Sequence, residues 1–513
     1  MASLADQLSN EILMARQRVY RAGRPTPLES MAFPGVPTPV WVKREDLGPI
    51  NAYKWRGAAN RMALLGENER AIGVVAASAG NHAQGVARAA RIFGTRARIF
   101  MPRSTPYMKQ EAVRRHGGDC VDVVLSGDSY DHAAGEALAA AKEGGHPFIH
   151  PYDDLAVMGG QGTLADEVVM AGTPPLTKAY VQIGGGGLAA ATACWLKRYY
   201  PGIHVVGVEG VDQASMAAAV RAGQPVDLGY VDVFSDGTAV RRAGDLTFQL
   251  CRDLIDEFIT VTNNEICNAV KHLWEASRVI PEPAGAVGLA GLMQQANQIN
   301  PHDNVLVILC GANMDFSQLA FISRHAGIGT AEKRFIRFPM RERRGSLIEV
   351  LRGLPENINI FDVQYGRTGA DMSYPVLGLQ ATPDHFAALG RYLSSLEIPH
   401  QDVTSDEDVD FRIISYDAKF FSHPLFVHIE FPERPGAFLG FMEHVAGISN
   451  LCYFNYAFSG ERVGRALIGL ESDSADERHD LIEHLQRLAA DSGPIRAVRE
   501  VPAETLDRIL GRG

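Results

Sequence analysis

Short apolar runs alternate with helical patterns along the chain as far as about Gly327. Each run has the length and composition of a buried strand. The alternation predicts a parallel α/β sheet that helices cover on both faces. The predicted strands are residues 72–76, 97–101, 119–124, 179–183, 204–209 and 304–309. Ligands in such sheets collect beyond the carboxyl ends of the strands, so we expect the loops at Ser78, Gly184 and Cys310 to converge on one cleft.

The pattern changes near Ala331, where a repeat begins. A strand at residues 335–339 leads through an arginine-rich turn into a helix, and residues 426–439 repeat this order about ninety residues later. Both copies continue into strands that end near residues 366 and 460. The repeat predicts two small α+β modules of the ferredoxin-like class. The alternative is a coincidence of common dipeptides.

Composition and charge argue against several classes of protein. The chain has 513 residues, too many for one ordinary core, and 46% of them are hydrophobic. The net charge of −11 argues against a nucleic-acid surface. We find no apolar stretch that could span a bilayer and no signal peptide in residues 1–10. Six scattered cysteines fit a reducing compartment, so we expect a cytoplasmic protein without membrane or nucleic-acid partners.

Four consecutive glycines, Gly184 to Gly187, lie between a predicted strand and an alanine-rich helix that begins at Leu188. Without side chains, successive backbone N–H groups can close on an anion, and the helix start adds its partial positive charge. The pattern therefore predicts a phosphate cradle, and the alternative is a flexible linker. The spacing is neither that of a dinucleotide site nor that of a nucleotide P-loop, so a small phosphate ester fits better.

A turn of small residues follows the strand at residues 72–76, and an alanine-rich helix follows the turn. Ser78, Asn81 and the N–H groups of the helix start have the chemistry to hold a carboxylate or a ring hydroxyl. The alternative is an ordinary helix cap, for which serine and asparagine are favoured residues. We expect His82 in the same turn to be structural rather than catalytic.

Lys54 lies among bulky and apolar neighbours, between Tyr53 and Trp55. Burial disfavours the ammonium form of a lysine and lowers its pKa. A neutral amine can form an imine with an aldehyde cofactor. An isolated lysine of this kind is most often an ordinary helix-start residue, but the predicted phosphate cradle favours the nucleophile.

Several segments, taken in order, resemble one family. They include Lys-Arg-Glu-Asp at 43–46 and Ser-Ala-Gly-Asn-His-Ala-Gln-Gly at 78–85. The others are residues 53–58, 159–164, 184–188, 234–240, 282–286 and 310–313. In these motifs the chain resembles the fold-type II pyridoxal-phosphate enzymes of the tryptophan-synthase-β-like superfamily. Within it, the chain is most similar to the biosynthetic threonine ammonia-lyases (threonine dehydratases), and the resemblance covers nearly the whole length.

The resemblance implies a catalytic domain over residues 1–327 and two ACT-like regulatory modules over residues 333–410 and 424–505. It implies dehydration and deamination of L-threonine to 2-oxobutanoate and ammonia, the first committed step of isoleucine biosynthesis. In that family the modules bind isoleucine and, in many members, valine. Members are commonly homotetramers.

The resemblance also implies roles for single residues. Lys54 is expected to form the imine with pyridoxal 5′-phosphate and then to remove the Cα proton of the substrate. The cofactor phosphate is the suggested donor of the proton that the leaving hydroxyl needs. The expected cofactor-binding residues are Lys54, Asn81, Gly184, Gly185, Gly186, Gly187, Leu188 and Cys310. The expected substrate-binding residues are Ser78, Ala79, Gly80, Asn81 and His82.

Four positions depart from patterns of the superfamily or bear on the reaction. Cys310 stands where serine usually faces the pyridine nitrogen, and it is likewise a neutral partner; the alternative is a buried core cysteine. Ala52 replaces a serine two residues before the lysine. Ala79 stands where racemases of the superfamily carry a serine, and alanine cannot carry a proton, which favours elimination. Glu282 lies where family members place a carboxylate near the substrate or a cation, or it is a solvated loop acid.

Two other functions stay open from the sequence. One is a related lyase that prefers L-serine or another β-substituted amino acid. The other is an amino-acid-binding regulatory protein on a degenerate enzyme scaffold. Aromatic residues near Phe361, Tyr365 and Tyr456 are candidates for an effector pocket, although aromatics in such modules more often belong to the core. The motifs leave open the effector's identity, the response to valine, the assembly state and any requirement for a cation.

Overall fold

The computed structural model describes residues 2–328, 332–355, 358–432, 437–457, 463–490 and 494–511. The chain divides into two compact units, Met1–Gly329 and Thr330–Gly513. No helix in the described part of the chain has the length and hydropathy of a membrane span. The change of pattern near Ala331, the turn at 433–436 and the strand end near 460 were predicted at positions outside the described residues.

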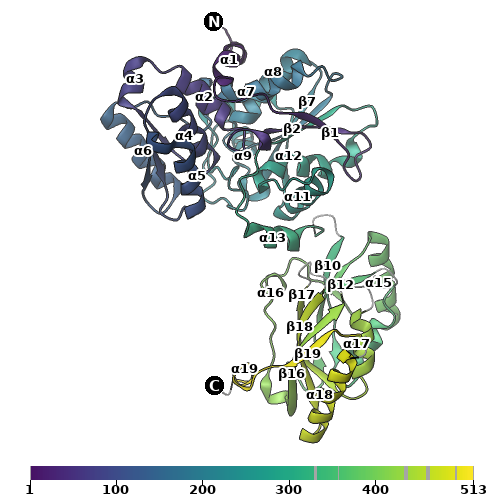
Figure 1. Cartoon of the computed structure of the whole chain (residues 1–513). Helices are drawn as coiled ribbons and strands as arrows, with labels where there is room; N and C mark the ends of the chain where they lie inside the picture. The colour runs from purple at the N-terminus through teal and green to yellow at the C-terminus, as the bar shows by residue number, and fades with distance from the viewer. Residues whose placement is uncertain are drawn as a thin grey trace. The chain divides into compact units, whose positions relative to one another are not determined.

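The first unit contains a six-stranded sheet in the order β1-β2-β9-β6-β7-β8, parallel except for β1. Buried runs of aliphatic residues form its central strands, as a sheet covered on both faces requires. Figure 1 shows this part of the fold in purple to teal. In that order the strands are Leu28–Met31, Val40–Arg44, Val305–Leu309, Lys178–Gln182, His204–Gly210 and Glu257–Val261.

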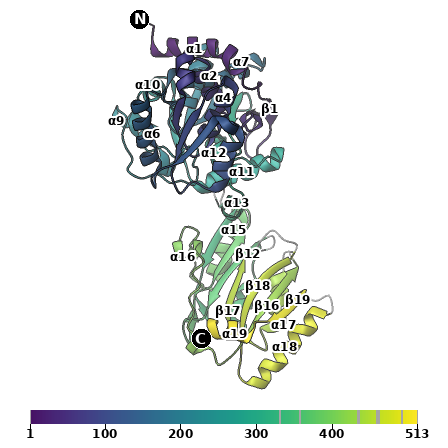
Figure 2. The ribbon, with the colours of Figure 1, turned by 60° about the vertical axis from the view of Figure 1, so that its left-hand side comes forward.

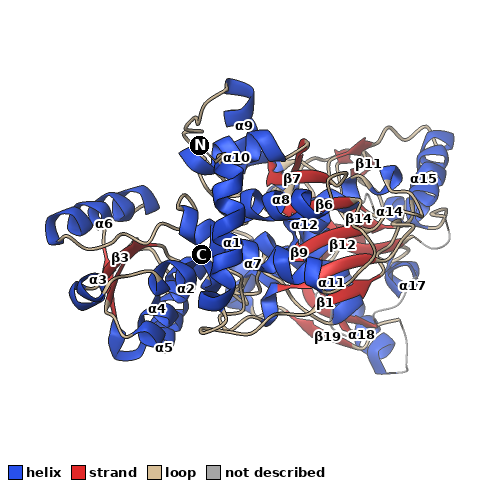
Figure 3. Ribbon diagram, turned by 90° about the horizontal axis from the view of Figure 1, so that it is seen from above, coloured by secondary structure: helices blue, strands red, loops and turns tan. Residues whose placement is uncertain are grey.

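A second, three-stranded parallel sheet belongs to the same unit and has the order β3-β4-β5 (Val74–Ala77, Ala97–Met101, Val121–Leu125). Figure 3 shows β3 among α3 to α6, away from the strands of the large sheet. All six strands predicted for this region are present, shifted by at most two residues at their starts. They are divided between two sheets, because a strand pattern does not specify which strands pair.

Helices pack against both sheets, and α2 packs against both α4 and α7 near the predicted site. Long helices such as α7 and α12 are almost entirely buried, which explains why they show little amphipathic periodicity. The helices α1 to α7 are Leu4–Val19, Trp55–Ala63, Glu67–Ile72, Asn81–Phe93, Tyr107–Gly117, Tyr130–Gly144 and Leu155–Met170. The helices α8 to α13 are Gly187–Tyr199, Ser215–Ala222, Asp245–Leu254, Asn263–Ser277, Pro283–Gln294 and Gln318–His325.

The second unit contains an eight-stranded antiparallel sheet in the order β15-β10-β14-β12-β17-β18-β16-β19. Figure 2 shows β12, β17, β18 and β16 in this sheet. The strands β10, β12, β14 and β15 are Lys333–Arg337, Asn359–Gly366, Val376–Gln380 and Gln401–Asp402. The strands β16 to β19 are His423–Pro432, Asn450–Ala457, Val463–Ser472 and Ala497–Glu500. A short hairpin, β11 (Met340–Arg341) with β13 (Met372–Ser373), lies outside it.

Each half of this sheet follows the order strand, helix, strand, strand, helix, strand of a ferredoxin-like module. The helices are α14 (Ser346–Leu351) and α15 (Pro383–Ser395) in the first half and α17 (Ala437–Val445) and α18 (Ala475–Ala490) in the second. All four helices contribute to one hydrophobic core against the sheet. Pairing of β12 with β17 joins the two halves edge to edge. The repeat seen in the sequence therefore corresponds to two halves of one continuous sheet.

Candidate active site

The segment that carries Lys54 is attached to the end of β9. Tyr53 donates its backbone N–H to the Cys310 carbonyl at 3.0 Å, and the Ala312 N–H donates to the Asn51 carbonyl at 2.9 Å. A β-bridge pairs Ala52 with Gly311 between these bonds. Residues far apart in the sequence are thereby held together at the carboxyl edge of the large sheet, where a parallel sheet binds its ligands.

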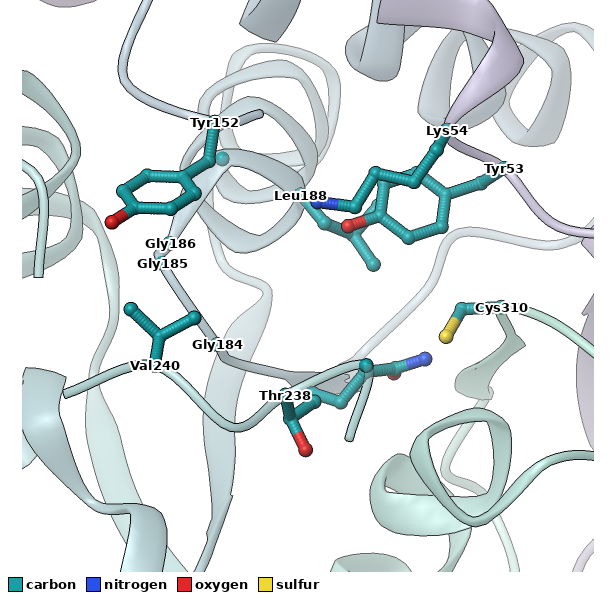
Figure 4. Close-up of a pocket in the computed structure, with 13 residues that line it drawn as sticks. Tyr53, Lys54, Tyr152, Gly184, Gly185, Gly186, Leu188, Thr238, Val240 and Cys310 are labelled. Atoms are coloured by element: carbon teal, nitrogen blue, oxygen red, sulfur yellow. The ribbon is translucent and has the colours of Figure 1, made fainter. Parts of the chain in front are cut away.

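A pocket lies at this edge, and it brings together most of the predicted cofactor-binding residues. Lys54, the glycine loop, Leu188 and Cys310 all line it. Figure 4 shows the Lys54 side chain extending into the space between the glycine loop and Cys310. The predicted turn at residues 78–82 is outside this lining, and Asn81 approaches it through Glu282, as described below.

Lys54 is half-buried and lies at the N-cap of α2. Its Nζ donates a hydrogen bond to the Pro151 carbonyl at 3.1 Å. Burial lowers the pKa of Lys54 to about 8, and the nearby Cys310 and Glu282 oppose this shift. A much larger fraction of the amine is therefore neutral at physiological pH than for a solvated lysine, which is the state a nucleophile or a base needs.

The glycine loop has no room for side chains. A Cβ at Gly185 would overlap the Tyr152 ring, and one at Gly187 would lie 3.0 Å from the Tyr152 carbonyl oxygen. Gly186 has φ +95°, which favours glycine, and α8 begins directly after it. The first N–H groups of a helix have no intrahelical acceptor. The loop therefore presents backbone donors at a cradle that any Cβ would fill, which fits a phosphate group.

The carbonyl groups of this loop are turned to other partners. The Thr247 hydroxyl donates to the Gly185 carbonyl at 2.6 Å, and the Cys251 thiol lies 3.7 Å from the Gly186 carbonyl. These two contacts come from α10. Carbonyl oxygens repel an anion, but these two already have hydrogen-bond partners on α10. The loop geometry therefore supports the binding of an anion.

Cys310 directly follows β9 and is buried. Its Sγ contacts the Ala284 carbonyl at 3.4 Å, and burial raises the pKa of its thiol, so the group stays protonated and neutral. A neutral thiol fits a pyridine nitrogen that needs no charged partner. No cysteine of the chain is paired in a disulfide.

Glu282 and two asparagines form a hydrogen-bonded chain beside the pocket. Asn81 donates its side-chain N–H to Glu282 Oε1 at 2.7 Å, and Asn313 donates to Asn81 Oδ1 at 2.8 Å. Glu282 is 3% exposed, so it is not a solvated loop acid, and burial raises its pKa to about 7. A Cβ at Gly311 would overlap this carboxyl group. No cluster of three or more His, Cys, Asp or Glu side chains suited to a metal occurs in the described ranges.

The other residues of the predicted turn are brought together at the start of α4. Ser78 Oγ accepts the Gly80 N–H at 3.2 Å, and Gly80 rather than a serine or asparagine is the N-cap. The Asn81 amide goes to Glu282 instead of capping the helix. His82 is buried with Nε2 2.9 Å from the Ile149 carbonyl, and burial lowers its pKa to about 3, which agrees with a structural, neutral histidine.

Several lining residues received no role from the sequence. Tyr152 packs on the glycine loop, and Thr238 lies on the opposite side of it, with its Cα 3.0 Å from a Cβ built at Gly184. Thr238 belongs to a family motif, residues 234–240, that could have directed attention to it. Nothing in the local pattern around Tyr152 indicates its place, because its contacts are with a loop more than thirty residues away.

Comparison with known proteins identifies the family. Residues 19–311 match the family of pyridoxal-phosphate dependent enzymes, and residues 422–494 match the C-terminal regulatory domain of threonine dehydratase. The chain is 36% identical to the biosynthetic L-threonine dehydratase of Haemophilus influenzae over 91% of each protein. It is 35% identical to that of Escherichia coli over 93% of each.

Solved structures agree. The processed form of threonine deaminase isoform 2 from Solanum lycopersicum is 38% identical, with a TM-score of 0.60 over 63% of this chain and 94% of that one. The threonine deaminase of T.th. is 30% identical, with a TM-score of 0.55 over 60% of this chain and 98% of that one. This chain therefore belongs to the biosynthetic threonine dehydratase family of pyridoxal-phosphate dependent enzymes.

Proposed function

We propose that this chain converts L-threonine to 2-oxobutanoate and ammonia with pyridoxal 5′-phosphate as its cofactor. The observation that carries the proposal is the opposition, across one pocket, of a lysine amine and a glycine cradle built from backbone. The relatives that this chain matches over more than nine-tenths of their length are named biosynthetic L-threonine dehydratases, which supports L-threonine as the substrate. We propose as the role the first committed step of isoleucine biosynthesis, which the family resemblance implies.

In this proposal each group of the pocket has a task. Pyridoxal phosphate, when bound, supplies an aldehyde for an amine and a ring that accepts the electron pair of a broken Cα–H bond. The Lys54 amine holds the cofactor aldehyde and then takes the Cα proton on Nζ. Gly184, Gly185, Gly186 and Gly187, with Leu188 in the first turn of α8, bind the phosphate. Cys310 offers the ring nitrogen a neutral thiol, so that the ring is a moderate electron sink suited to elimination.

We propose that the turn at residues 78–82 orients the substrate. Ser78, Gly80 and the first N–H groups of α4 are suited to a carboxylate. Ala79 has no group that moves a proton, so no acid or base from this position faces the substrate, and elimination is favoured over racemisation. Asn81, held by Glu282, is suited to the cofactor ring hydroxyl, and His82 supports the turn from the core.

The test is formation of 2-oxo acid by the cofactor-loaded full chain. We expect a higher kcat/KM with L-threonine than with L-serine, and the reverse preference would make the chain a serine-preferring lyase instead. Borohydride should remove the visible absorbance of the bound cofactor and trap its mass on the peptide with Lys54. A colourless protein after loading would indicate a regulatory protein on a degenerate scaffold and would contradict the enzyme.

We also propose feedback inhibition by isoleucine, with valine as a second effector, through modules at residues 333–410 and 424–505. An effector alters activity only if it binds two conformations unequally. Of the three candidate aromatics, Tyr365 most clearly belongs to the hydrophobic core rather than to an effector pocket. Its hydroxyl donates to Glu342 Oε1 at 2.7 Å and also lies 3.1 Å from the Leu451 carbonyl, and Phe361 and Tyr456 are also buried.

The test of regulation compares the full chain with one that ends at residue 328. We expect isoleucine to inhibit 2-oxo acid formation by the full chain and to leave the shortened chain unaffected. The solved relatives that match only about three-fifths of this chain support a catalytic unit that folds alone. Inhibition of the shortened chain by isoleucine would locate the effector site in residues 1–327.

We further propose a cytoplasmic homotetramer. The unpaired cysteines fit a reducing compartment, and the net charge of −11 gives no support for a nucleic-acid partner. Light scattering on the eluting peak of a sizing column measures the assembly directly, and a mass of one or two chains would contradict the tetramer.

A further inference from the structure

Three of the described residues that line the pocket carry a hydroxyl group: Tyr53, Tyr152 and Thr238. Thr238 Oγ1 is engaged with Ser235 Oγ and Gln213 Oε1, both at 2.8 Å. Tyr152 donates its hydroxyl to the Arg242 carbonyl at 3.4 Å. The Tyr53 hydroxyl has no hydrogen-bond partner within the described ranges. It is therefore the one pocket hydroxyl among them that is free to act on a ligand.

Tyr53 is held firmly next to the lysine. Its backbone N–H is bonded to the Cys310 carbonyl, and Ala52 before it is bridged to Gly311. Lys54 Nζ lies 5.4 Å from the centre of the Tyr53 ring. Figure 4 shows the Tyr53 ring and the Lys54 side chain extending into the same space of the pocket. A phenol and an amine on adjacent residues thus approach one ligand together.

The surroundings of Tyr53 keep its hydroxyl protonated. Burial is the main cause that raises the pKa of this phenol well above its ordinary value, and Cys310 and Glu282 add to the shift. A phenol that does not ionise near neutral pH is a hydrogen donor rather than a base. The neighbouring amine has the opposite tendency, because burial lowers the pKa of Lys54. In the resting site the phenol therefore carries its proton while the amine can be neutral, so a proton and a base are both present beside one ligand.

Elimination of water has a chemical need that this arrangement meets. Hydroxide is a poor leaving group, so the β-hydroxyl of the substrate must receive a proton as the Cβ–O bond breaks. The family resemblance assigns that proton to the cofactor phosphate, and neither Ala52 nor Ala79 offers a hydroxyl. We propose that the Tyr53 hydroxyl protonates the leaving β-hydroxyl, an inference that rests on the proposed function of the site.

The step is balanced in protons and electrons. The Cα–H bond breaks, and its proton goes to Lys54 Nζ. The bonding pair becomes the Cα–Cβ double bond as the Cβ–O bond breaks and its electron pair leaves with the oxygen. That oxygen takes the Tyr53 proton and departs as water. The phenolate of Tyr53 then recovers a proton from the Lys54 ammonium beside it, so both residues return to their starting states.

The test varies the leaving group. β-Chloro-L-alanine loses chloride, which needs no proton, whereas L-threonine loses hydroxide. General acid catalysis contributes on the order of 100-fold or more, so Tyr53→Phe is expected to lower kcat/KM for L-threonine by about that factor. The same variant should change kcat/KM for β-chloro-L-alanine less than about threefold. A rate effect confined to the hydroxyl substrate is a result that damage to the fold would not produce.

Two controls accompany the variant. Tyr152→Phe removes a hydroxyl from the same pocket, and it is expected to change both substrates by one factor, leaving their ratio as in the wild type. The affinity of the unloaded Tyr53→Phe protein for pyridoxal phosphate and its thermal midpoint should match those of the wild type.

The outcomes separate the two proposals. If the wild type forms no 2-oxo acid from L-threonine, the proposed function fails. If the wild type is active and Tyr53→Phe slows both substrates equally, or slows neither, the role of Tyr53 is refuted while the function stands. In that case the cofactor phosphate would again be the suggested donor of the proton.

Discussion

Removal of the Arg56 guanidinium should lower the free energy of unfolding of the catalytic unit far more than an ordinary surface substitution does. Arg56 follows Lys54 by two residues and is fully buried. Its Nε donates to Glu45 Oε2 at 2.8 Å, and its Nη1 donates to Glu167 Oε1 at 2.6 Å. Lys43 Nζ lies 2.5 Å from Glu167 Oε2. Two buried cations thus balance two buried carboxylates beneath the start of α2.

The change Arg56→Met keeps most of the side-chain volume but leaves Lys43 as the one cation that the described structure pairs with Glu45 and Glu167. Loss of one partner from a buried ion pair costs about 3–5 kcal/mol, because the remaining charge stays desolvated. Domains are typically stable by only about 5–15 kcal/mol, so much of the stability of the unit is at stake. Arg114→Met removes an exposed partner of Glu111 and should cost about 0.5 kcal/mol or less.

Tryptophan fluorescence during urea unfolding measures the stability of the first unit separately from that of the second. All four tryptophans, Trp41, Trp55, Trp195 and Trp274, belong to the first unit, so their emission reports on that unit alone. In the wild type, Arg56 and Lys43 hold the pKa of Glu167 below its ordinary value. Without Arg56 that pKa rises, so the lost stability should partly return as the pH falls toward about 5. A cost below about 1 kcal/mol, or no larger than that of Arg114→Met, would refute the reasoning.

Three further outcomes follow from the pocket. Lys54→Ala should abolish 2-oxo acid formation and leave the urea midpoint near that of the wild type, since the one hydrogen bond that Lys54 Nζ makes within the described ranges goes to the Pro151 carbonyl; substantial turnover would contradict its role. Uptake of pyridoxal phosphate by the unloaded protein, followed by absorbance, should rise with pH around a midpoint of about 8, because the neutral amine reacts. A midpoint near that of a solvated lysine would contradict the burial argument. Gly185→Ala should weaken cofactor affinity about tenfold or more, equivalent to about 1.4 kcal/mol, by displacing Tyr152, whereas Gly202→Ala, which meets nothing within 4 Å, should not.

Strands that are buried on both faces were the most predictable parts of the fold. The central strands β9 and β7 are nearly continuous apolar runs, and such runs need no partner to be recognised. The strand β1 was missed because it has four residues and only one of them is buried. The strand β2 was missed because it ends in two charged residues, Lys43 and Arg44. The buried charge of Lys43 is compensated by Glu167, which is distant in sequence. The residues next to β2 in the sequence do not indicate such compensation.

The site was predictable where its chemistry needs an unusual local composition. Four glycines between a predicted strand and a predicted helix have few explanations, so the loop could be singled out from its local sequence, and neighbours such as Tyr152 were not needed for that prediction. Tyr53 stood next to Lys54 in the sequence and received no role, because its significance depends on the engagement of Thr238 and Tyr152 by other groups. Which hydroxyl is left free is a property of contacts between distant segments. The edge-to-edge joining of β12 and β17 escaped prediction for the same reason.

Burial favours the neutral forms of the ionisable side chains in and beside the pocket. It is the largest cause of the lowered pKa of Lys54 and of the raised pKa values of Tyr53, Glu282 and Cys310. Lys54 is the one charged side chain among the described lining residues. In the proposed site the phosphate of the cofactor would therefore meet backbone N–H groups and the start of α8 rather than arginine or lysine. A fixed cation there would attract the phosphate more strongly, but its field would also reach the pocket and oppose the ammonium of Lys54. Recognition of the anion by backbone dipoles instead allows tight phosphate binding and a lysine whose proton is easily exchanged near neutral pH.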